Sequence, residues 1–237
     1  MTTYATIARS GAAATALSRT ITKIREKKPM MVSFFGDSIS EVDLVPGWYG
    51  GASCREKHYA QVFRALAAER WGHPHITVHY FGIGGQNAYE GLGRLHLLQT
   101  VKPDLVIVAF GANDIAAHAL APAQHAMALK LIFSGLRTRL DCDIMAMAAS
   151  SGGPDFELWE QVGPFVQAQA DICLNERVPF VNTRQELLNR LAHGEPWSNY
   201  YPSHFDGHPN DAGQRLFGEM LFQLIDVNLA PGATFGT

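Results

Sequence analysis

Five short apolar runs alternate with segments of helical periodicity, and this alternation restricts the folds open to the chain. The runs cover residues 30–35, 76–81, 104–110, 143–149 and 178–182. Strands separated by helices pair in parallel, and runs that are apolar throughout are typical of strands buried on both faces. We therefore predict an α/β protein in which helices cover both faces of a central five-stranded parallel sheet.

Apolar residues recur at helical spacing between and after these runs. The segments lie near residues 59–67, 88–95, 129–140, 155–175, 187–191 and 216–224. We expect a kink or break at Gly163-Pro164, because proline removes a helical hydrogen bond. The 237 residues contain no repeat and no linker, so residues 30–237 form one predicted domain.

Composition removes several classes of function. The formal net charge is −3, and no basic stripe suggests a nucleic-acid partner. No apolar run is long enough to span a membrane. Cys54, Cys142 and Cys173 are odd in number, widely spaced and outside any metal-ligand spacing. We interpret them as reduced thiols in a cytoplasmic protein.

Residues 1–29 differ from the rest and are predicted to be an N-terminal helical extension. Leu17, Ile21 and Ile24 share one helical face, and a basic group precedes Pro29. A secretory signal is not expected, whereas an organellar transit peptide remains an alternative. The extension is expected to pack on the domain or to reach a partner, such as a second copy or a neighbouring domain.

Four loops carry the polar residues that are candidates for a functional site. Ser38 follows the first run, residues 82–87 follow the second, Asn113 follows the third, and His208 precedes the last helical segment. In open parallel sheets the functional crevice lies beyond the carboxyl ends of the strands. A serine nucleophile needs a base and oxyanion donors, and these loops contain both kinds of group.

Each residue also has a simpler explanation. Ser38 could cap a helix, while His208 and Asn113 could stabilise turns. The glycines of residues 82–85 could form a phosphate-binding loop, although they match the known glycine patterns only in part. Asp37 and Asp114 are expected to be structural, because a carboxylate beside the nucleophile opposes the developing negative charge.

Together the segments resemble the ordered motifs of the SGNH/GDSL hydrolases. The blocks are Gly36-Asp37-Ser38, then residues 80–85, then Gly111-Ala112-Asn113-Asp114, then His208-Pro209-Asn210 with Gly213. The resemblance runs from about residue 30 to residue 227. It implies a flavodoxin-like three-layer sandwich and a carboxylic ester hydrolase that needs no metal or cofactor.

The resemblance also implies a role for each residue. Ser38 would attack the acyl carbonyl, and His208 would accept and return the proton. The oxyanion hole would comprise the backbone N–H groups of Ser38 and Gly85 and the side-chain amide of Asn113. A glycine at position 85 lets the backbone approach the substrate closely.

Two positions depart from the family pattern. The family acid lies three residues before the histidine, where this chain has Phe205, while Asp206 lies two residues before His208. We predict that Asp206 orients His208, with a backbone carbonyl as the alternative. Tyr80 stands where an asparagine often begins the glycine block, and a structural role is expected for it.

Aromatic and basic residues flank the predicted site on both sides. Trp48, Tyr49 and Arg55 are expected to form one wall of the pocket, and Tyr200 and Tyr201 the facing wall. Packing at the domain edge is the alternative for both groups.

The motifs most resemble members of the family that remove acetyl groups from sugars. We therefore predict an esterase for short acyl groups, chiefly carbohydrate O-acetyl esters. The alternatives are a lysophospholipase or thioesterase with a longer apolar groove, and a non-catalytic glycan-binding module on the same fold.

Overall fold

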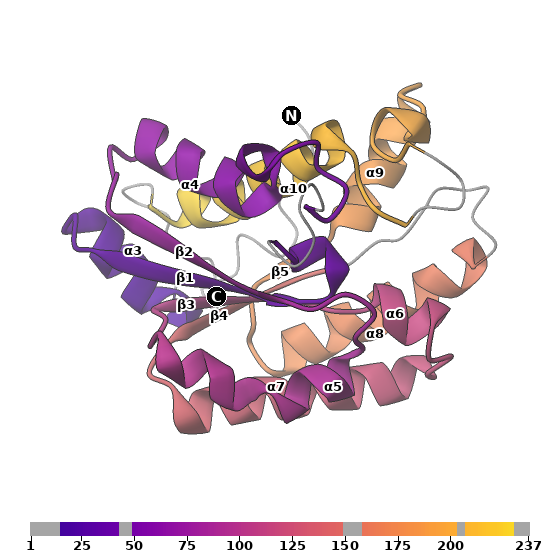
Figure 1. The fold of residues 1–237 in the computed structure, drawn as a ribbon, viewed down its shortest axis with the longest axis horizontal. Helices are drawn as coiled ribbons and strands as arrows, with labels where there is room; N and C mark the ends of the chain where they lie inside the picture. The colour runs from indigo at the N-terminus through magenta and orange to yellow at the C-terminus, as the bar shows by residue number, and fades with distance from the viewer. Residues whose placement is uncertain (1–14, 43–48, 149–157, 203–206, 230–237) are drawn as a thin grey trace, which may run out of the picture.

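The computed structural model describes residues 15–42, 49–148, 158–202 and 207–229. Its centre is a five-stranded, all-parallel sheet in the order β2-β1-β3-β4-β5 (Figure 1). The strands are β1 (Met30–Gly36), β2 (Ile76–Gly82), β3 (Leu105–Ala109), β4 (Asp143–Met147) and β5 (Phe180–Val181). All five predicted strands are present, and the predicted α/β fold class is confirmed.

Helices cover both faces of the sheet, as predicted. Figure 1 shows α4, α9 and α10 on one face and α5, α7 and α8 on the other. Their bounds are α4 (Tyr59–Arg70), α5 (Ala88–Gly93), α7 (Pro122–Arg139), α8 (Trp159–Asn175), α9 (Thr183–Ala192) and α10 (Asp211–Leu229). Helix α8 is continuous through Pro164, so the sequence-based expectation of a break there is wrong.

The alternation of side chains along the strands divides the core in two. Phe34 points toward α4, where its ring meets Tyr59 edge to face at 5.2 Å. Phe35, the next residue, points to the opposite face and meets Phe110 at 5.2 Å. Both clusters are closed by helices, which explains why these strands are apolar at nearly every position.

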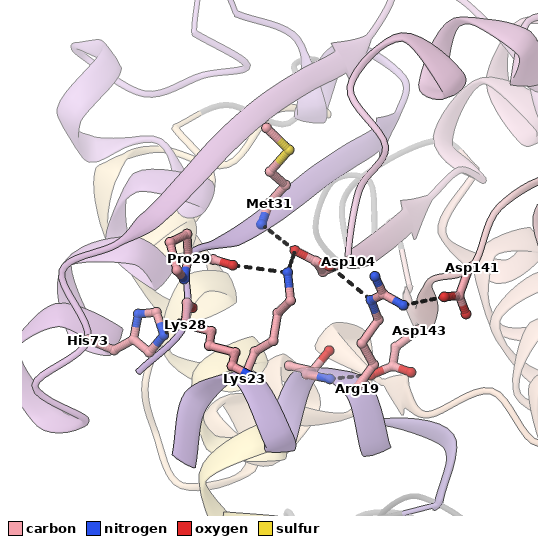
Figure 2. A network of polar contacts seen from close by, with 10 residues as sticks. Arg19, Lys23, Lys28, Pro29, Met31, His73, Asp104, Asp141 and Asp143 are labelled. Carbon is pink, nitrogen blue, oxygen red and sulfur yellow. Dashed lines mark hydrogen bonds and ion pairs between the residues drawn. The ribbon is translucent and has the colours of Figure 1, made fainter. Parts of the chain in front are cut away.

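Helix α3 (Ser18–Arg25) lies at the amino ends of the strands. Leu17, Ile21 and Ile24 are buried in the core. Figure 2 shows the polar network beside them, centred on Asp104, which precedes β3. The Asp104 carboxylate accepts hydrogen bonds from Arg19 Nε at 2.9 Å, Lys23 Nζ at 2.7 Å and the Met31 N–H at 2.9 Å.

The neighbouring strand holds the same helix. The Thr20 backbone N–H donates to the Asp143 carboxylate, at the start of β4, at 2.6 Å. The helix is therefore joined to β1, β3 and β4 by charged hydrogen bonds and by its apolar face. It packs at the end of the sheet opposite the strand-end loops.

The three cysteines are free thiols. In the part of the chain that the structure describes, no helix has both the length and the hydrophobicity needed to cross a membrane.

Candidate active site

Ser38 begins the short 3-10 helix η1 (Ser38–Ser40), directly after β1. The preceding Gly36 has no room for a side chain, because an added Cβ would lie 2.2 Å from the Ala109 carbonyl oxygen of β3. Asp37 caps η1 by accepting a hydrogen bond from the Ile39 N–H at 3.0 Å. This tight turn presents Ser38 at the carboxyl end of β1.

Asp37 is fully buried beneath the turn. Burial raises the pKa of its carboxyl to about 7, and its backbone N–H donors offset the effect only in part. Asp114 is also buried and adds to the rise in the pKa of Asp37. Asp114 itself bonds to the Ala88 N–H and to His125 Nδ1, the latter at 2.9 Å. Both carboxylates hold loops in place, which agrees with their predicted structural roles.

His208 faces the serine from the loop before α10. Its Nε2 atom lies 2.8 Å from Ser38 Oγ, a hydrogen-bond distance between residues 170 positions apart in sequence. Gly51 supports this loop from behind and has φ of +90°, and a Cβ there would lie 2.9 Å from the His208 Cβ. The contact between serine and imidazole is the geometry that general-base activation requires.

Two backbone N–H groups at this crevice have no partner among the residues that the structure describes. Neither the Ser38 N–H nor the Gly85 N–H donates to any described residue. Gly85 has φ of +78°, and an added Cβ would meet no heavy atom within 4 Å. The Gly85 carbonyl is bonded on its far side to His118 Nε2 at 3.2 Å. This bond holds the peptide group that follows Gly85, while the Gly85 N–H, which belongs to the preceding peptide group, stays available.

Asn113 supplies a third donor from α6 (Ala112–Ala116), the helix that follows β3. Its Nδ2 donates one hydrogen to the Gln86 carbonyl oxygen at 3.2 Å. An amide nitrogen carries two hydrogens, so the second remains for a ligand. The predicted donors Ser38, Gly85 and Asn113 therefore come from the ends of β1, β2 and β3, which are neighbours in the sheet.

Arg94 joins the loops that carry these donors. Its guanidinium donates to the Gly36 and Phe81 carbonyl oxygens, at the ends of β1 and β2, and to Gln86 Oε1 at 2.6 Å. It also lies over the Phe35 ring at 4.6 Å. Burial lowers the pKa of Arg94 to about 10, so the group stays charged at neutral pH.

His58 fixes the turn from the other side. Its Nδ1 accepts from the Ala60 N–H at 3.2 Å, so Nε2 carries the proton and donates to the Ile39 carbonyl oxygen at 3.0 Å. Burial lowers the pKa of His58 to about 3, and the ring is neutral. Sequence patterns singled out neither His58 nor Arg94. Arg94 interrupts an apolar segment, whereas His58 follows Arg55-Glu56-Lys57 and carries no such signal.

The residues predicted to form the pocket walls differ in exposure. Tyr49 is half-buried, and Arg55 is exposed with its guanidinium 5.3 Å from the Tyr80 ring. Tyr200 and Tyr201 are buried; the Tyr200 hydroxyl bonds to Arg190 at 2.8 Å, and Tyr201 stacks on Trp197 at 5.6 Å. Packing, the alternative given for these two tyrosines, describes them better than a pocket wall.

Two predicted site residues, Asp206 and Trp48, lie outside the described residues. Tyr80 is held by Gln61, whose Nε2 donates to the tyrosine hydroxyl at 2.6 Å, as suits a structural residue. Among the described residues no three His, Cys, Asp or Glu side chains gather as metal ligands.

Comparison with models of known protein families gave a match over most of the chain. A family model described as the GDSL-like Lipase/Acylhydrolase family matches residues 34–216. A comparison with curated proteins gave no match.

Several solved structures share the fold. A two-domain esterase active on acetylated mannans superposes with a TM-score of 0.73 and 19% identity, covering 94% of this chain and 55% of that chain. The present chain thus spans about half the length of that protein. An acetylxylan esterase from Geobacillus stearothermophilus gives 0.68 and 17%, covering 83% and 94%. A putative GDSL-like lipase from Parabacteroides merdae gives 0.70 and 15%, covering 84% and 97%.

Proposed function

Because the chain belongs to the GDSL-like lipase/acylhydrolase family and is a carboxylic ester hydrolase, we propose that Ser38 and His208 remove short acyl groups, above all acetyl, from carbohydrate. The observation that carries the catalytic assignment is the 2.8 Å contact between Ser38 Oγ and His208 Nε2. It lies at the carboxyl end of β1, close to the three available donors.

The proposed reaction follows from these contacts. His208 takes the proton as Ser38 Oγ attacks the acyl carbonyl, and a tetrahedral oxyanion forms. The N–H groups of Ser38 and Gly85 and the second amide hydrogen of Asn113 stabilise that oxyanion. His208 then gives its proton to the leaving alcohol oxygen, and water hydrolyses the acyl-enzyme by the same steps in reverse order.

We assign the orientation of His208 to Asp206. A base in a serine hydrolase gains from an acid that fixes its tautomer and stabilises the imidazolium. Asp206 is two residues from His208 in sequence. If Asp206→Ala kept a near-normal turnover number, the acid would be dispensable and the site would work as a dyad.

The acetyl-sugar assignment draws on the solved structures with this fold. One acts on acetylated mannans and another is an acetylxylan esterase. At 19% and 17% identity these likenesses extend to the fold alone, so the substrate is our proposal for this chain.

The test combines substrates with active-site variants. We expect wild-type protein to hydrolyse acetylated oligosaccharides and p-nitrophenyl acetate, and Ser38→Ala and His208→Ala to abolish both activities while the fold is retained. A fluorophosphonate should label wild-type protein and not Ser38→Ala. A strong preference for acyl chains beyond about eight carbons would overturn the acetyl assignment, because each buried methylene adds about 0.8 kcal/mol. Absence of both labelling and hydrolysis would favour a binding module.

A further inference from the structure

Glu41 places a carboxylate inside the crevice beside the nucleophile. It follows η1, three residues after Ser38, and its exposed fraction is only 6%. An added Cβ on Gly84 would lie 2.6 Å from Glu41 Oε2 and 3.7 Å from the Ser38 Cβ. The Glu41 carboxylate and the serine therefore flank the same glycine, which is exposed and directly precedes Gly85 of the oxyanion hole.

The carboxylate has no donor of its own. No described residue hydrogen-bonds to or pairs with the Glu41 side chain, and Glu41 is not among the residues with further interactions. The carboxylate oxygen atoms are not among the buried side-chain atoms that lack a hydrogen-bond partner, so water reaches them in the crevice. A negative charge close to the oxyanion opposes catalysis, so a carboxylate at this position needs a reason beyond the chemical step. A ligand group that donates a hydrogen bond to Glu41 in place of that water supplies such a reason.

The chemistry of the reaction identifies which part of the ligand does so. A carboxylate accepts hydrogen bonds and donates none. A short acyl group such as acetyl carries no donor, so the donor must lie on the alcohol part of the ester. Carbohydrate esters provide free hydroxyl groups next to the esterified oxygen.

We propose that Glu41 accepts a hydrogen bond from a free hydroxyl group of the alcohol part, adjacent to the acyl ester that Ser38 attacks. This inference rests on the proposed role of Ser38 and makes Glu41 a specificity-determining residue. A side chain at position 84 would press on the Glu41 carboxylate, because its Cβ would lie 2.6 Å from Glu41 Oε2.

The test compares two esters of nearly equal size, 2-hydroxyethyl acetate and propyl acetate. In propyl acetate a methyl group stands in place of the hydroxyl group. A hydrogen bond to a charged group corresponds to about 10- to 100-fold. We expect kcat/KM of wild-type protein to favour the hydroxy ester by at least about tenfold. Glu41→Met should reduce this preference to within about twofold, and Glu41→Gln should lie between because its amide oxygen still accepts.

Glu219→Gln, on α10 and paired with Arg215, is the charge-matched control and should keep the wild-type preference. Fluorophosphonate labelling of Ser38 verifies that each variant retains a folded site. If Glu41→Met keeps the full preference for the hydroxy ester, the proposal is overturned. It is also overturned if wild-type protein shows no such preference but favours acetylcholine over 3,3-dimethylbutyl acetate, since Glu41 would then bind cations.

These outcomes separate the two proposals. A hydroxyl preference that depends on Glu41, in a protein that leaves acetylated oligosaccharides intact, would support Glu41 and reject the carbohydrate substrate. Cleavage of acetylated oligosaccharides with equal kinetics in wild-type protein and Glu41→Met would support the carbohydrate substrate and reject the role of Glu41. Failure of every ester, together with no labelling of Ser38, would reject both.

Discussion

The residues that we propose face the reacting carbonyl keep hydrogen-bonding capacity that the described part of the protein leaves unused. Gly85 is anchored through its carbonyl oxygen, one peptide group after the N–H, and Asn113 is anchored through one amide hydrogen. Fixing a residue through one polar group while its donor stays free lets a site stabilise charge without reorganising during the reaction.

Replacing Asn113 by alanine should therefore affect turnover more than binding. We expect Asn113→Ala to lower kcat by about 10²–10³, because one oxyanion donor is lost, with little change in KM. Steady-state kinetics on p-nitrophenyl acetate would measure both. Asn189→Ala on α9 is the control and should match wild-type protein. A rise in KM at unchanged kcat would mean that Asn113 binds the substrate rather than its transition state.

The sequence predicts site residues that directly follow a strand. It does not predict residues whose roles depend on contacts with segments far away in the chain. Ser38, Gly85 and Asn113 each follow an apolar run, so their common location could be predicted. Arg94 acts through carbonyl oxygens of two other strands, and Glu41 through its position beside Gly84. Nothing local in the sequence encodes those contacts.

At the scale of elements, the loops at the carboxyl ends of β1 and β2 depend on one buried cation. Arg94 donates hydrogen bonds to backbone carbonyl oxygens at the ends of both strands and to Gln86 Oε1. The backbone carbonyl of Gln86 accepts a hydrogen bond from Asn113. The fork of guanidinium donors reaches three acceptors that a single ammonium cannot reach together.

Arg94→Lys should consequently misplace the oxyanion hole while keeping a positive charge. A displacement of about 1 Å at a catalytic group reduces rates by about 10². We expect kcat to fall by a factor of this order with KM nearly unchanged. Arg215→Lys on the exposed face of α10 is the control. If Arg94→Lys lost stability but kept wild-type kcat, Arg94 would be structural only.

The position of helix α3 depends on charged groups at the amino ends of the strands. Burial favours the neutral form of Asp104, but the donors from Lys23, Met31 and Arg19 outweigh it and lower the pKa of Asp104. Because the pKa in the folded state is depressed, this contribution to stability is present above the unfolded value of 3.8 and is lost as pH falls through the folded value.

Asp104→Asn should loosen α3 without affecting the site. We expect the free energy of unfolding at pH 7 to fall by about 1–3 kcal/mol, as for hydrogen bonds to a charged group. Activity should be unchanged, because the active site lies at the opposite end of the sheet. Urea unfolding of Asp104→Asn and of the exposed Asp141→Asn would test this, with the latter within about 0.5 kcal/mol of wild-type protein. A similar loss in both variants would contradict the role of Asp104.

At the scale of the whole molecule, the fold was more predictable than the placement of its parts. Alternating apolar runs and helices determine a parallel sheet, and all five strands formed where expected. The strand order β2-β1-β3-β4-β5 depends on packing between distant segments. The continuity of α8 through Pro164 likewise reflects tertiary packing, because Val162, Phe165 and Val166 are buried around it.

The active site and the stability of the molecule are also coupled through two buried groups with opposite pH dependences. The pKa of His58 is lowered from 6.5 to about 3 by burial, so its contribution to stability is complete above pH 6.5 and is lost as pH falls toward 3. The pKa of Asp37 is raised from 3.8 to about 7, so its contribution is greatest below pH 3.8 and declines as pH rises toward 7. Between pH 3.8 and 6.5 the two slopes oppose each other.

Removing the His58 imidazole should leave the pH dependence of stability that Asp37 causes. In His58→Gln the unfolded state no longer gains a proton at position 58, so acidification should destabilise this variant less than it destabilises wild-type protein. One pKa unit corresponds to about 1.4 kcal/mol, so from pH 7.5 to pH 4.5 the variant should gain about 3 kcal/mol relative to wild-type protein. Chemical unfolding at several pH values measures this difference directly, and contributions from all other groups cancel in it. His96→Gln, which alters an exposed histidine, should run parallel to wild-type protein; parallel curves for His58→Gln as well would show that His58 titrates normally in the fold.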